Sequence, residues 1–294
     1  MLLSVDYILS KVKVEKIDLA VNHFLFKSTL ASTFICAQLD LPFYLRLHTK
    51  RHLYSEKVLI SVLNSANKIS AIARDVSNFY KTKIDKTKDI GVIRQSVDIS
   101  FLTQVESKPS DNELFTIIAI GRLIEKKGFN QLVEAFDMLG KPLQERSCVK
   151  IYGDGSCLKS LKTDIVQRGL DSRIQLMGKK EYKPLMSELA NADLLVVPSV
   201  ELEDDIDGIP TVIIEAMVLK TTVLAYDTGS ISEVVLPYKT GFLVPANDVS
   251  QLTEQMSNLI LNTAKLHSVI EEAHDQALVK YKHTLANELT LGTD

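Results

Sequence analysis

The stretch from Pro198 to Met217, PSVELEDDIDGIPTVIIEAM, leads from the end of an apolar strand through an acidic loop into an apolar helix. Asp207 and Glu215 lie eight residues apart, on the two sides of a Gly-Ile-Pro turn (208–210). Both carboxylates can face a ligand at the carboxyl edge of a sheet. Backbone N–H groups of residues 208–212 would point the same way and favour an anion. The stretch therefore predicts a ligand site within an α/β fold.

Strands and helices alternate around this stretch, which favours parallel pairing in a doubly wound sheet. We predict residues 114–275 as a complete Rossmann-like domain, followed by a helical C-terminal tail over 276–294. Asp248 is a suitable cap for the last helix of the domain. The strands are predicted at 114–123, 147–156, 173–178, 193–199, 221–229 and 241–248, and the helices at 129–139, 158–168, 182–192 and 249–261, with further helix over about 265–289.

Residues 1–105 repeat the alternation in a shorter form. A free-standing doubly wound domain usually has five or six strand–helix units, so this part is predicted to be an incomplete Rossmann-like domain. The polar segment 104–113 is predicted as the linker. The fold class is therefore α/β with two doubly wound domains. In this first part, strands are predicted at 17–22, 43–47, 68–73 and 91–97, and helices at 27–39, 55–65 and 75–83.

Composition favours an intracellular protein. No apolar run reaches the ~18 residues of a membrane-spanning helix, and Met1 to Leu9 lacks the basic start and cleavage site of a signal peptide. The three cysteines, Cys36, Cys148 and Cys157, form no metal-ligand spacing and are read as reduced. We therefore expect a cytoplasmic location.

The net charge of −3 is the sum of two opposite halves. Residues 1–110 hold 16 basic and 10 acidic residues (+6), and residues 111–294 hold 18 and 27 (−9). This difference is either ordinary surface chemistry or a basic surface that faces an anionic partner, such as a membrane surface or a phosphorylated acceptor. The lysines at 81, 83, 86 and 88 have no interleaved aromatic residues, so a nucleic-acid partner is not expected.

Two cations follow the strand at 114–123, at Arg122 and Lys127. An Arg fork and a mobile Lys charge together suit a diphosphate, although two surface cations would give the same pattern. Gly153 and Gly155 after the next strand permit a close approach by a ligand or by the facing domain, or simply form a tight turn. His48 ends a strand of the first part, where ligands bind in open sheets. His23, at the end of the preceding strand, borders the same crevice or serves in packing.

Several segments resemble, in order and spacing, the family 4 retaining glycosyltransferases of the GT-B architecture, most closely bacterial enzymes that build exopolysaccharide or lipopolysaccharide. The strong part covers residues 114–261, and VIRQSVDISFL, AIARDVSNFYK and NHFLFKSTLA…LPFYLRLH extend it more weakly toward the N-terminus. The strong segments are GRLIEKKGFNQLVEAF, IYGDGS, VVPS, DGIPTVIIEAM, TGSISEVV and TGFLVPANDVSQL.

The resemblance implies transfer of a hexose-type sugar from a UDP- or GDP-sugar to a hydroxyl of a glycan or lipid-linked acceptor, with retention and without a metal or cofactor. Catalytic roles fall on His48, Arg122, Lys127 and Asp207: the cations stabilise the leaving diphosphate, and His48 lies near the sugar and acceptor. Glu215 is implied to hold the ribose and Asp207 to contact the donor sugar. The implied nucleotide-sugar site comprises Gly121, Arg122, Lys127, Asp207, Gly208, Ile209, Pro210 and Glu215.

Some positions depart from the family pattern. Asp207 stands where the family prefers Glu, Gln95-Ser96 replaces Asn-Gly, and about 100 N-terminal residues of the family have no counterpart here. The alternative is therefore a non-catalytic or split-gene remnant that binds nucleotide or a partner subunit. A metal-dependent transferase using Asp205 and Asp207, or a sugar-nucleotide epimerase, are further readings. Against the metal-dependent interpretation, Glu201, Glu203, Asp204 and Asp205 are more simply a solvated acidic run.

Overall fold

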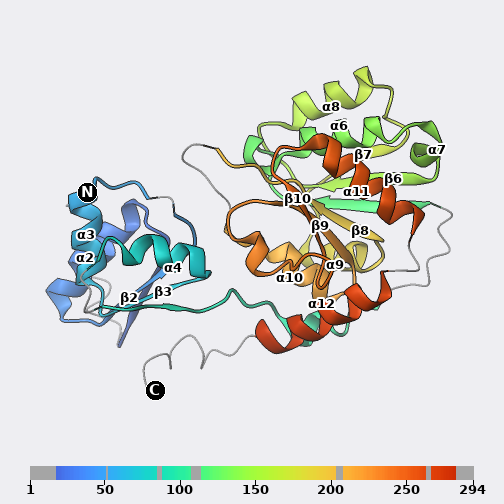
Figure 1. Cartoon of the computed structure of the whole chain (residues 1–294). Coiled ribbons are helices and arrows are strands. Elements are labelled where there is room, and N and C mark those ends of the chain that lie inside the picture. Colours follow the sequence, from blue (N-terminus) through green and yellow to red (C-terminus); the bar gives the residue numbers. More distant parts are fainter. Residues whose placement is uncertain are drawn as a thin grey trace. The chain divides into compact units, whose positions relative to one another are not determined.

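The computed structural model describes residues 18–50, 52–84, 88–106, 114–202, 208–262 and 266–282. These residues divide into two compact units, the first ending at Arg94 and the second beginning at Gln95. Each unit is built around a parallel sheet with helices (Figure 1). The prediction of an α/β fold with doubly wound sheets is confirmed.

The sheet of the first unit has four strands within the described residues, in the order β1-β2-β3-β4, all parallel. Its apolar core includes Phe43, Leu45 and Leu47 from β2 and Leu59 and Leu63 from α3. The elements are β1 (Ala20–His23), α2 (Lys27–Leu39), β2 (Phe43–Leu47), α3 (Glu56–Ser65), β3 (Lys68–Ala71), α4 (Arg74–Lys81) and β4 (Ile90–Val92).

The strand predicted at 91–97 is wrong at its end, because β4 stops at Val92. Beyond that point the carbonyls of Ile93 and Arg94 accept hydrogen bonds from the Arg46 guanidinium rather than from a neighbouring strand. Val97 forms a bridge with Lys282, after the last described helix. The chain is thus extended over this segment without lengthening the first sheet.

The sheet of the second unit has six parallel strands within the described residues, in the order β10-β9-β8-β5-β6-β7. Its strands are β5 (Phe115–Ile120), β6 (Ser147–Tyr152), β7 (Ile174–Gly178), β8 (Leu194–Val197), β9 (Thr222–Asp227) and β10 (Phe242–Pro245). All four residues of β8 are buried, as expected for a central strand covered on both faces. The six predicted strands of this part are therefore confirmed, with shorter bounds.

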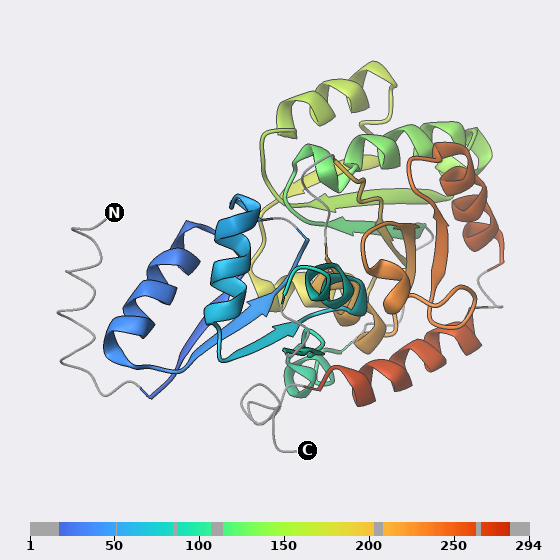
Figure 2. The same cartoon turned by 60° about the vertical axis from the view of Figure 1, so that its left-hand side comes forward.

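Helices cover both faces of this second sheet. On one face α6 packs against α8 and α11, and on the other α10 packs against α9 and α12 (Figures 1 and 2). The helical segments are α5 (Ile99–Leu102), η1 (Glu125–Lys127), α6 (Phe129–Met138), α7 (Lys141–Glu145), α8 (Leu158–Gln167), α9 (Tyr182–Ala190), α10 (Thr211–Val218), η2 (Ile231–Glu233), α11 (Val249–Leu261) and α12 (His267–Lys280).

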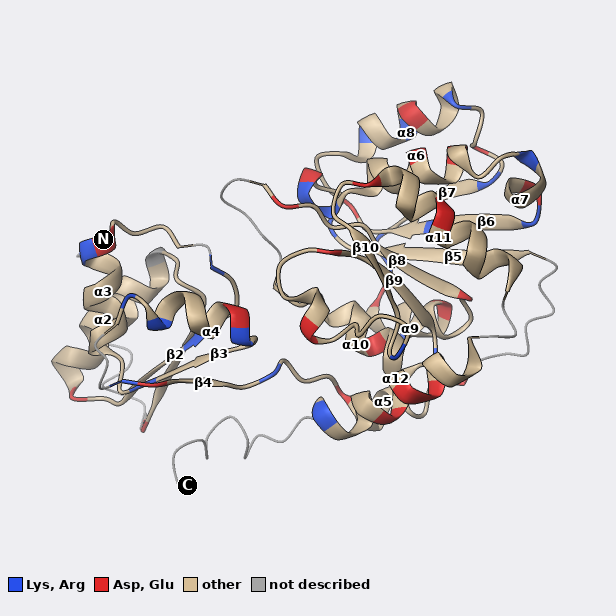
Figure 3. Cartoon of the chain, viewed as in Figure 1, with Lys and Arg blue, Asp and Glu red and all other residues tan. Residues whose placement is uncertain are grey.

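The last described helix, α12, packs on the same face of the second sheet as α9 and α10. Lys220 forms an ion pair with Glu271 at 2.7 Å, and His274 Nδ1 lies 2.8 Å from the Val218 carbonyl oxygen. Several positions along α12 carry the colour of acidic residues in Figure 3. The predicted helix is confirmed to Lys280, and its continuation beyond residue 282 lies outside the described residues.

At α11, Asp248 accepts from the Gln251 backbone N–H at 2.9 Å, which confirms the predicted cap.

Candidate functional site

The turn after β5 carries both predicted cations. Arg122 is exposed and Lys127 is half-buried. The aliphatic part of Lys127 lies over Gly121: a Cβ built at Gly121 would meet the Lys127 Cδ and Cε at 3.7 Å. Gly121 is held in place by its N–H, which donates to the Tyr152 carbonyl at 3.0 Å. The Lys127 side chain thus lies alongside the end of the strand that precedes Arg122.

This turn is fastened to the loop after β8. The Val200 N–H donates to the Lys126 carbonyl at 2.9 Å. Gly128 has a left-handed backbone (φ +61°), and a Cβ at this position would lie 1.8 Å from the Pro198 carbonyl oxygen. A side chain at Gly128 would therefore meet both backbone strain and a clash. The cation-bearing turn and the start of the Pro198–Met217 stretch form one packed edge.

The Gly-x-Gly turn after β6 serves the same packing. A Cβ at Gly153 would lie 1.8 Å from the Gly121 carbonyl oxygen, and one at Gly155 would lie 2.4 Å from that of Leu123. The Leu123 N–H also donates to the Asp154 carbonyl at 2.9 Å. Of the two interpretations left open by the sequence, the structure shows a tight turn whose glycines admit the neighbouring backbone.

Glu215 lies in α10 and is buried, with 8% of its surface exposed. The Tyr182 hydroxyl, from the start of α9, donates a hydrogen bond to Glu215 Oε1 at 3.0 Å. Burial raises the pKa of Glu215, and the hydrogen bond from Tyr182 lowers it in part. A carboxylate can accept about four hydrogen bonds. Glu215 is therefore a buried acceptor with capacity for ligand hydroxyl groups.

The turn before α10 contributes fewer donors than the sequence suggested. Pro210 is the N-cap residue and has no N–H, while the Ile213 N–H donates to the Pro210 carbonyl at 3.1 Å. Thr211 and Val212 carry the N–H groups that an α-helix does not use internally. Gly208 and Ile209 precede the cap, with Ile209 buried. Asp207, together with residues 203–206, lies outside the described residues.

Glu201 has a structural role that the sequence did not suggest. Its carboxylate Oε1 accepts a hydrogen bond from the Gly229 N–H at 3.0 Å, although the residue is exposed. The neighbouring Thr228 hydroxyl donates to the Ser199 carbonyl at 3.2 Å. These bonds tie the loop after β8 to the loop after β9. Glu201 is therefore exposed to solvent, as predicted, and in addition accepts a hydrogen bond from the loop after β9.

In the first unit, two histidines meet at the carboxyl edge of the sheet. His23 ends β1 and His48 follows β2, and His23 Nδ1 lies 2.9 Å from His48 Nε2. The Phe24 ring stacks on the His48 ring, with centroids 4.2 Å apart. Burial, and then the charges of His23 and Arg46, lower the pKa of His48 to about 4. His48 is therefore a neutral hydrogen-bonding group at neutral pH.

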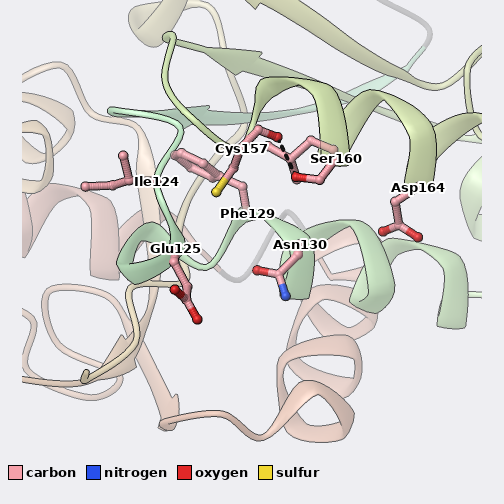
Figure 4. Close-up of a pocket in the computed structure, with 8 residues that line it drawn as sticks. Ile124, Glu125, Phe129, Asn130, Cys157, Ser160 and Asp164 are labelled. Carbon is pink, nitrogen blue, oxygen red and sulfur yellow. Dashed lines mark hydrogen bonds between the residues drawn. The ribbon is translucent and has the colours of Figure 1, made fainter. Parts of the chain in front are cut away.

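A cavity of about 310 Å³ lies on the other side of the turn, between η1, α6 and α8 (Figure 4). Its lining combines apolar side chains and the Cys157 thiol with polar and charged side chains. It does not include Arg122, Lys127 or Glu215. The full lining is Ile124, Glu125, Phe129, Asn130, Cys157, Ser160, Leu161 and Asp164. We therefore place the candidate site at the edge that carries Glu215 and not in this cavity.

Among residues 18–282 that the structure describes, no group of three or more His, Cys, Asp and Glu side chains is arranged to hold a metal ion. Within the same described ranges, no helix is long and apolar enough to cross a membrane. All three cysteines are free thiols.

The sequence placed the cations and Glu215 at one sheet edge, and their strands, β5 and β8, are direct neighbours. It missed Tyr182, which is the hydrogen-bond partner of Glu215. Tyr182 follows β7, which lies three strands from β8 in the sheet, and it reaches Glu215 because α9 packs against α10. Its signal in the sequence is a tyrosine at the start of a helix that follows a strand.

The fold is that of open α/β proteins, in which ligand sites commonly lie where the parallel strands end. Residues 101–276, more than half of the chain, match the family described as "Glycosyl transferases group 1". The chain belongs to this family.

Two relatives are named for polysaccharide biosynthesis. The chain is 30% identical, over 203 residues, to the putative colanic acid biosynthesis glycosyltransferase WcaL of Escherichia coli K12, covering 67% of this chain and 49% of the relative. It is 28% identical to the amylovoran biosynthesis glycosyltransferase AmsK of Erwinia amylovora, covering 58% of this chain and 42% of the relative. The chain thus spans about half the length of these curated relatives.

Solved structures show the same fold at low sequence identity. Anabaena HepE, crystallised with UDP and glucose, superposes with a TM-score of 0.81 at 19% identity, covering 97% of this chain and 79% of HepE. Sucrose-phosphate synthase from Thermosynechococcus elongatus gives 0.78 at 17% identity, with coverage of 98% and 75%. The chain therefore has the GT-B type of fold.

Proposed function

We propose that this chain is a retaining glycosyltransferase that moves a hexose-type sugar from a UDP- or GDP-sugar to a hydroxyl acceptor in cell-surface polysaccharide biosynthesis. The family supports transfer of a sugar, and relatives named for colanic acid and amylovoran support a polysaccharide product. The UDP bound to Anabaena HepE supports a uridine nucleotide as the first donor to test.

The observation that carries the proposal is the buried carboxylate of Glu215 at the sheet edge. Tyr182 occupies one of its oxygens and the cation-bearing turn lies on the neighbouring strand. In the proposal, the remaining capacity of Glu215 accepts the ribose hydroxyls of the donor. Arg122 and Lys127 then face the diphosphate, where an Arg fork and a Lys charge suit phosphate oxygens. Gly121 keeps that turn close to the strand.

The proposed reaction replaces one bond to the sugar C1 with another on the same face. The bond from C1 to the diphosphate oxygen breaks, the acceptor oxygen bonds to C1, and the hydroxyl proton passes to the leaving diphosphate. Arg122 and Lys127 stabilise the charge that develops on the diphosphate, which is the usual role of preorganised cations. No metal or other cofactor is needed in this scheme.

His48 and Asp207 complete the proposed set of catalytic residues. His48 presents a neutral imidazole at the edge of the first sheet, suited to a sugar hydroxyl. Asp207 is proposed to contact the donor sugar, with Gly208, Ile209 and Pro210 leading into α10. Because Asp is one methylene shorter than the Glu of the family pattern, Asp207→Glu is an informative variant. A displacement of about 1 Å in a reacting group can change a rate by about 10²-fold.

The proposal is tested by calorimetric titration of the full chain with UDP, GDP and their sugars. We expect one nucleotide to bind. Arg122→Gln or Glu215→Ala should weaken binding by about 10- to 10²-fold, since hydrogen bonds to charged groups contribute about 1.5–3 kcal/mol. The matched control is Arg146→Gln, an exposed arginine just before β6, at the opposite edge of the same sheet.

A folded protein that binds none of these nucleotides would contradict the proposal. Nucleotide binding without transfer to any acceptor glycan would instead support the alternative of a binding-only chain.

For the acceptor, we propose a glycan or lipid-linked glycan at the inner face of the cell membrane, reached by a cytoplasmic protein. The basic first unit motivates this location, but several of its lysines are paired. Lys81 contacts Asp89 at 2.7 Å, and Lys83 contacts Glu56 at 3.7 Å. Co-sedimentation with anionic and neutral vesicles is the test, and equal binding to both would remove the electrostatic argument.

A further inference from the structure

His23, at the end of β1, contacts one of the two ring nitrogens of His48. β1 and β2 are parallel neighbours, with His23 paired to Arg46, so both histidines lie at the same strand ends. The 2.9 Å contact joins His23 Nδ1 to His48 Nε2. An imidazole has two ring nitrogens. With Nε2 engaged by His23, Nδ1 is the nitrogen that His48 can offer to a ligand.

Phe24 holds the plane of the His48 ring. The two rings are stacked 26° from parallel. Phe24 has a left-handed backbone (φ +68°), which is uncommon for a residue with a Cβ. Its carbonyl accepts from the Thr29 hydroxyl at 2.8 Å and from the Asn22 side-chain amide at 3.3 Å. These bonds hold Phe24 in a conformation that places its ring against His48.

Burial and neighbouring charges keep the His48 ring neutral. Its tautomer therefore determines which ring nitrogen donates a hydrogen bond and which accepts one. His23 on β1 and Arg46 on β2 both disfavour a positive charge on the ring, in addition to its burial. A neutral imidazole has one N–H and one bare nitrogen. If His23 donates to Nε2, then Nδ1 of His48 is a donor; if Nε2–H donates to His23, then Nδ1 is an acceptor. The partner of Nε2 therefore decides what Nδ1 presents.

We propose that His23 is a positioning residue, whose Nδ1 selects one tautomer and one orientation of His48, so that His48 Nδ1 meets a sugar hydroxyl in a fixed hydrogen-bonding role. This inference rests on the proposed function in that His48 faces the sugar. It does not require His48 to transfer a proton. Partners that orient a functional histidine commonly contribute about 10- to 10²-fold to activity at metal sites, and we expect an effect of that size here.

The test uses four variants of the full chain. His23→Phe keeps a ring and removes the nitrogen, and His23→Ala is a smaller variant at this exposed strand end. His23→Asn places a side-chain amide near the position of Nδ1, where it can keep a hydrogen bond to His48 Nε2. His52→Asn is the control, because His52 Nδ1 contacts the Tyr54 carbonyl oxygen at 3.1 Å and belongs to the same unit.

The first readout is ¹⁵N NMR of the histidine rings, which needs no substrate. One tautomer of His48 is expected in the wild type, in His23→Asn and in His52→Asn, and a mixture in His23→Phe and His23→Ala. The second readout is sugar transfer. His23→Phe should lower kcat by about 10- to 10²-fold with an unchanged KM for the donor, and His23→Asn should restore most of the loss.

A single unchanged tautomer in both His23→Phe and His23→Ala would overturn the inference, and so would a mixed tautomer with unchanged kcat. If the wild type transfers no sugar while the NMR result is as expected, the proposed function fails and the effect of His23 on the tautomer stands. The two failures are therefore distinguishable.

Discussion

The carboxyl edges of the two sheets place a titratable side chain in similar surroundings with opposite consequences. His48 in the first unit is half-buried and Glu215 in the second is buried, and each contacts a ring-bearing residue, His23 or Tyr182. Burial lowers the pKa of His48 and raises that of Glu215, because it disfavours the charged form of each. The comparison teaches that one physical cause gives the two units opposite responses to pH.

The same two edges also differ in which residue type adopts a left-handed backbone conformation. Phe24 and Gly128 both have left-handed backbones, at φ +68° and +61°. At Phe24 the side chain is needed, since its ring stacks on His48. At Gly128 a side chain has no room, since the Pro198 carbonyl oxygen occupies the position of a Cβ. Substitutions at these residues therefore test the comparison directly.

The largest effect is expected for Gly128→Ala. A methyl group there adds backbone strain of about 1–3 kcal/mol and a clash with Pro198, so we expect a loss of about 3 kcal/mol or more in unfolding free energy. Gly169→Ala is the matched control, because Gly169 has φ +68° and open space around its Cβ position. It should lose about 1 kcal/mol, the cost of the left-handed backbone. Equal losses of unfolding free energy in urea titrations of the two variants would show that the Pro198 backbone moves away from the added methyl group.

His48 should make the folded state less stable in acid. Below pH 6.5 the unfolded chain protonates this histidine, while the folded chain does so only near pH 4. The wild type should therefore lose at most about 3 kcal/mol relative to His48→Gln between these values, and less because the ring is partly exposed. Urea unfolding at pH 7, 5.5 and 4.5 measures the difference. Parallel curves for the two proteins would contradict it.

Glu215 should show the reverse pH dependence. Its folded pKa is raised, so the cost of its buried charge is present at high pH and disappears as the pH falls toward 4.5. Glu215→Gln should therefore stabilise the fold at pH 8 by about 0.5–2 kcal/mol, a typical gain at a functional site. Thermal unfolding at pH 8 and pH 4.5 measures the gain. A gain that is equal at both pH values would rule out the ionised carboxylate as its source.

The smallest effect is expected for Phe24→Gly. Glycine removes the strain of the left-handed backbone, about 1–2 kcal/mol, and loses the ring stacking, about 0.5–1.5 kcal/mol. The net change in unfolding free energy should be within about 1 kcal/mol. Asp40→Gly is the control, a left-handed residue (φ +51°) at the C-cap of α2, where only the gain is expected. Equal stabilisation of both variants would mean that the stacking on His48 contributes nothing.

The sequence predicted the parts of the structure that depend on periodicity and chain order. Alternating apolar segments indicated both parallel sheets, and the topology of such a sheet placed Arg122, Lys127 and Glu215 at one edge. α5 was missed because its four residues, Ile99–Leu102, are too few to show a helical period. Tyr182 was missed because its contact arises between helices, and helix packing is not written in the order of the strands.

The local backbone was equally hidden. The sequence around Phe24 does not indicate a left-handed backbone conformation. That conformation is accompanied by hydrogen bonds from the Asn22 and Thr29 side chains to the Phe24 carbonyl. The glycines at 153 and 155 did signal a close approach. The sequence could not tell whether a ligand or the neighbouring strand end was the approaching group.

The contact between Gly128 and Pro198 has a consequence for protein engineering. A chimera that takes residues 198–217 from a relative would replace the loop after β8 together with α10. Here the base of that loop is seated on the turn at 121–128, through the Pro198 carbonyl and the bond from the Val200 N–H to Lys126. Residues 121–128 and 198–217 therefore depend on each other's backbone positions. A chimera should take both segments from the same parent protein.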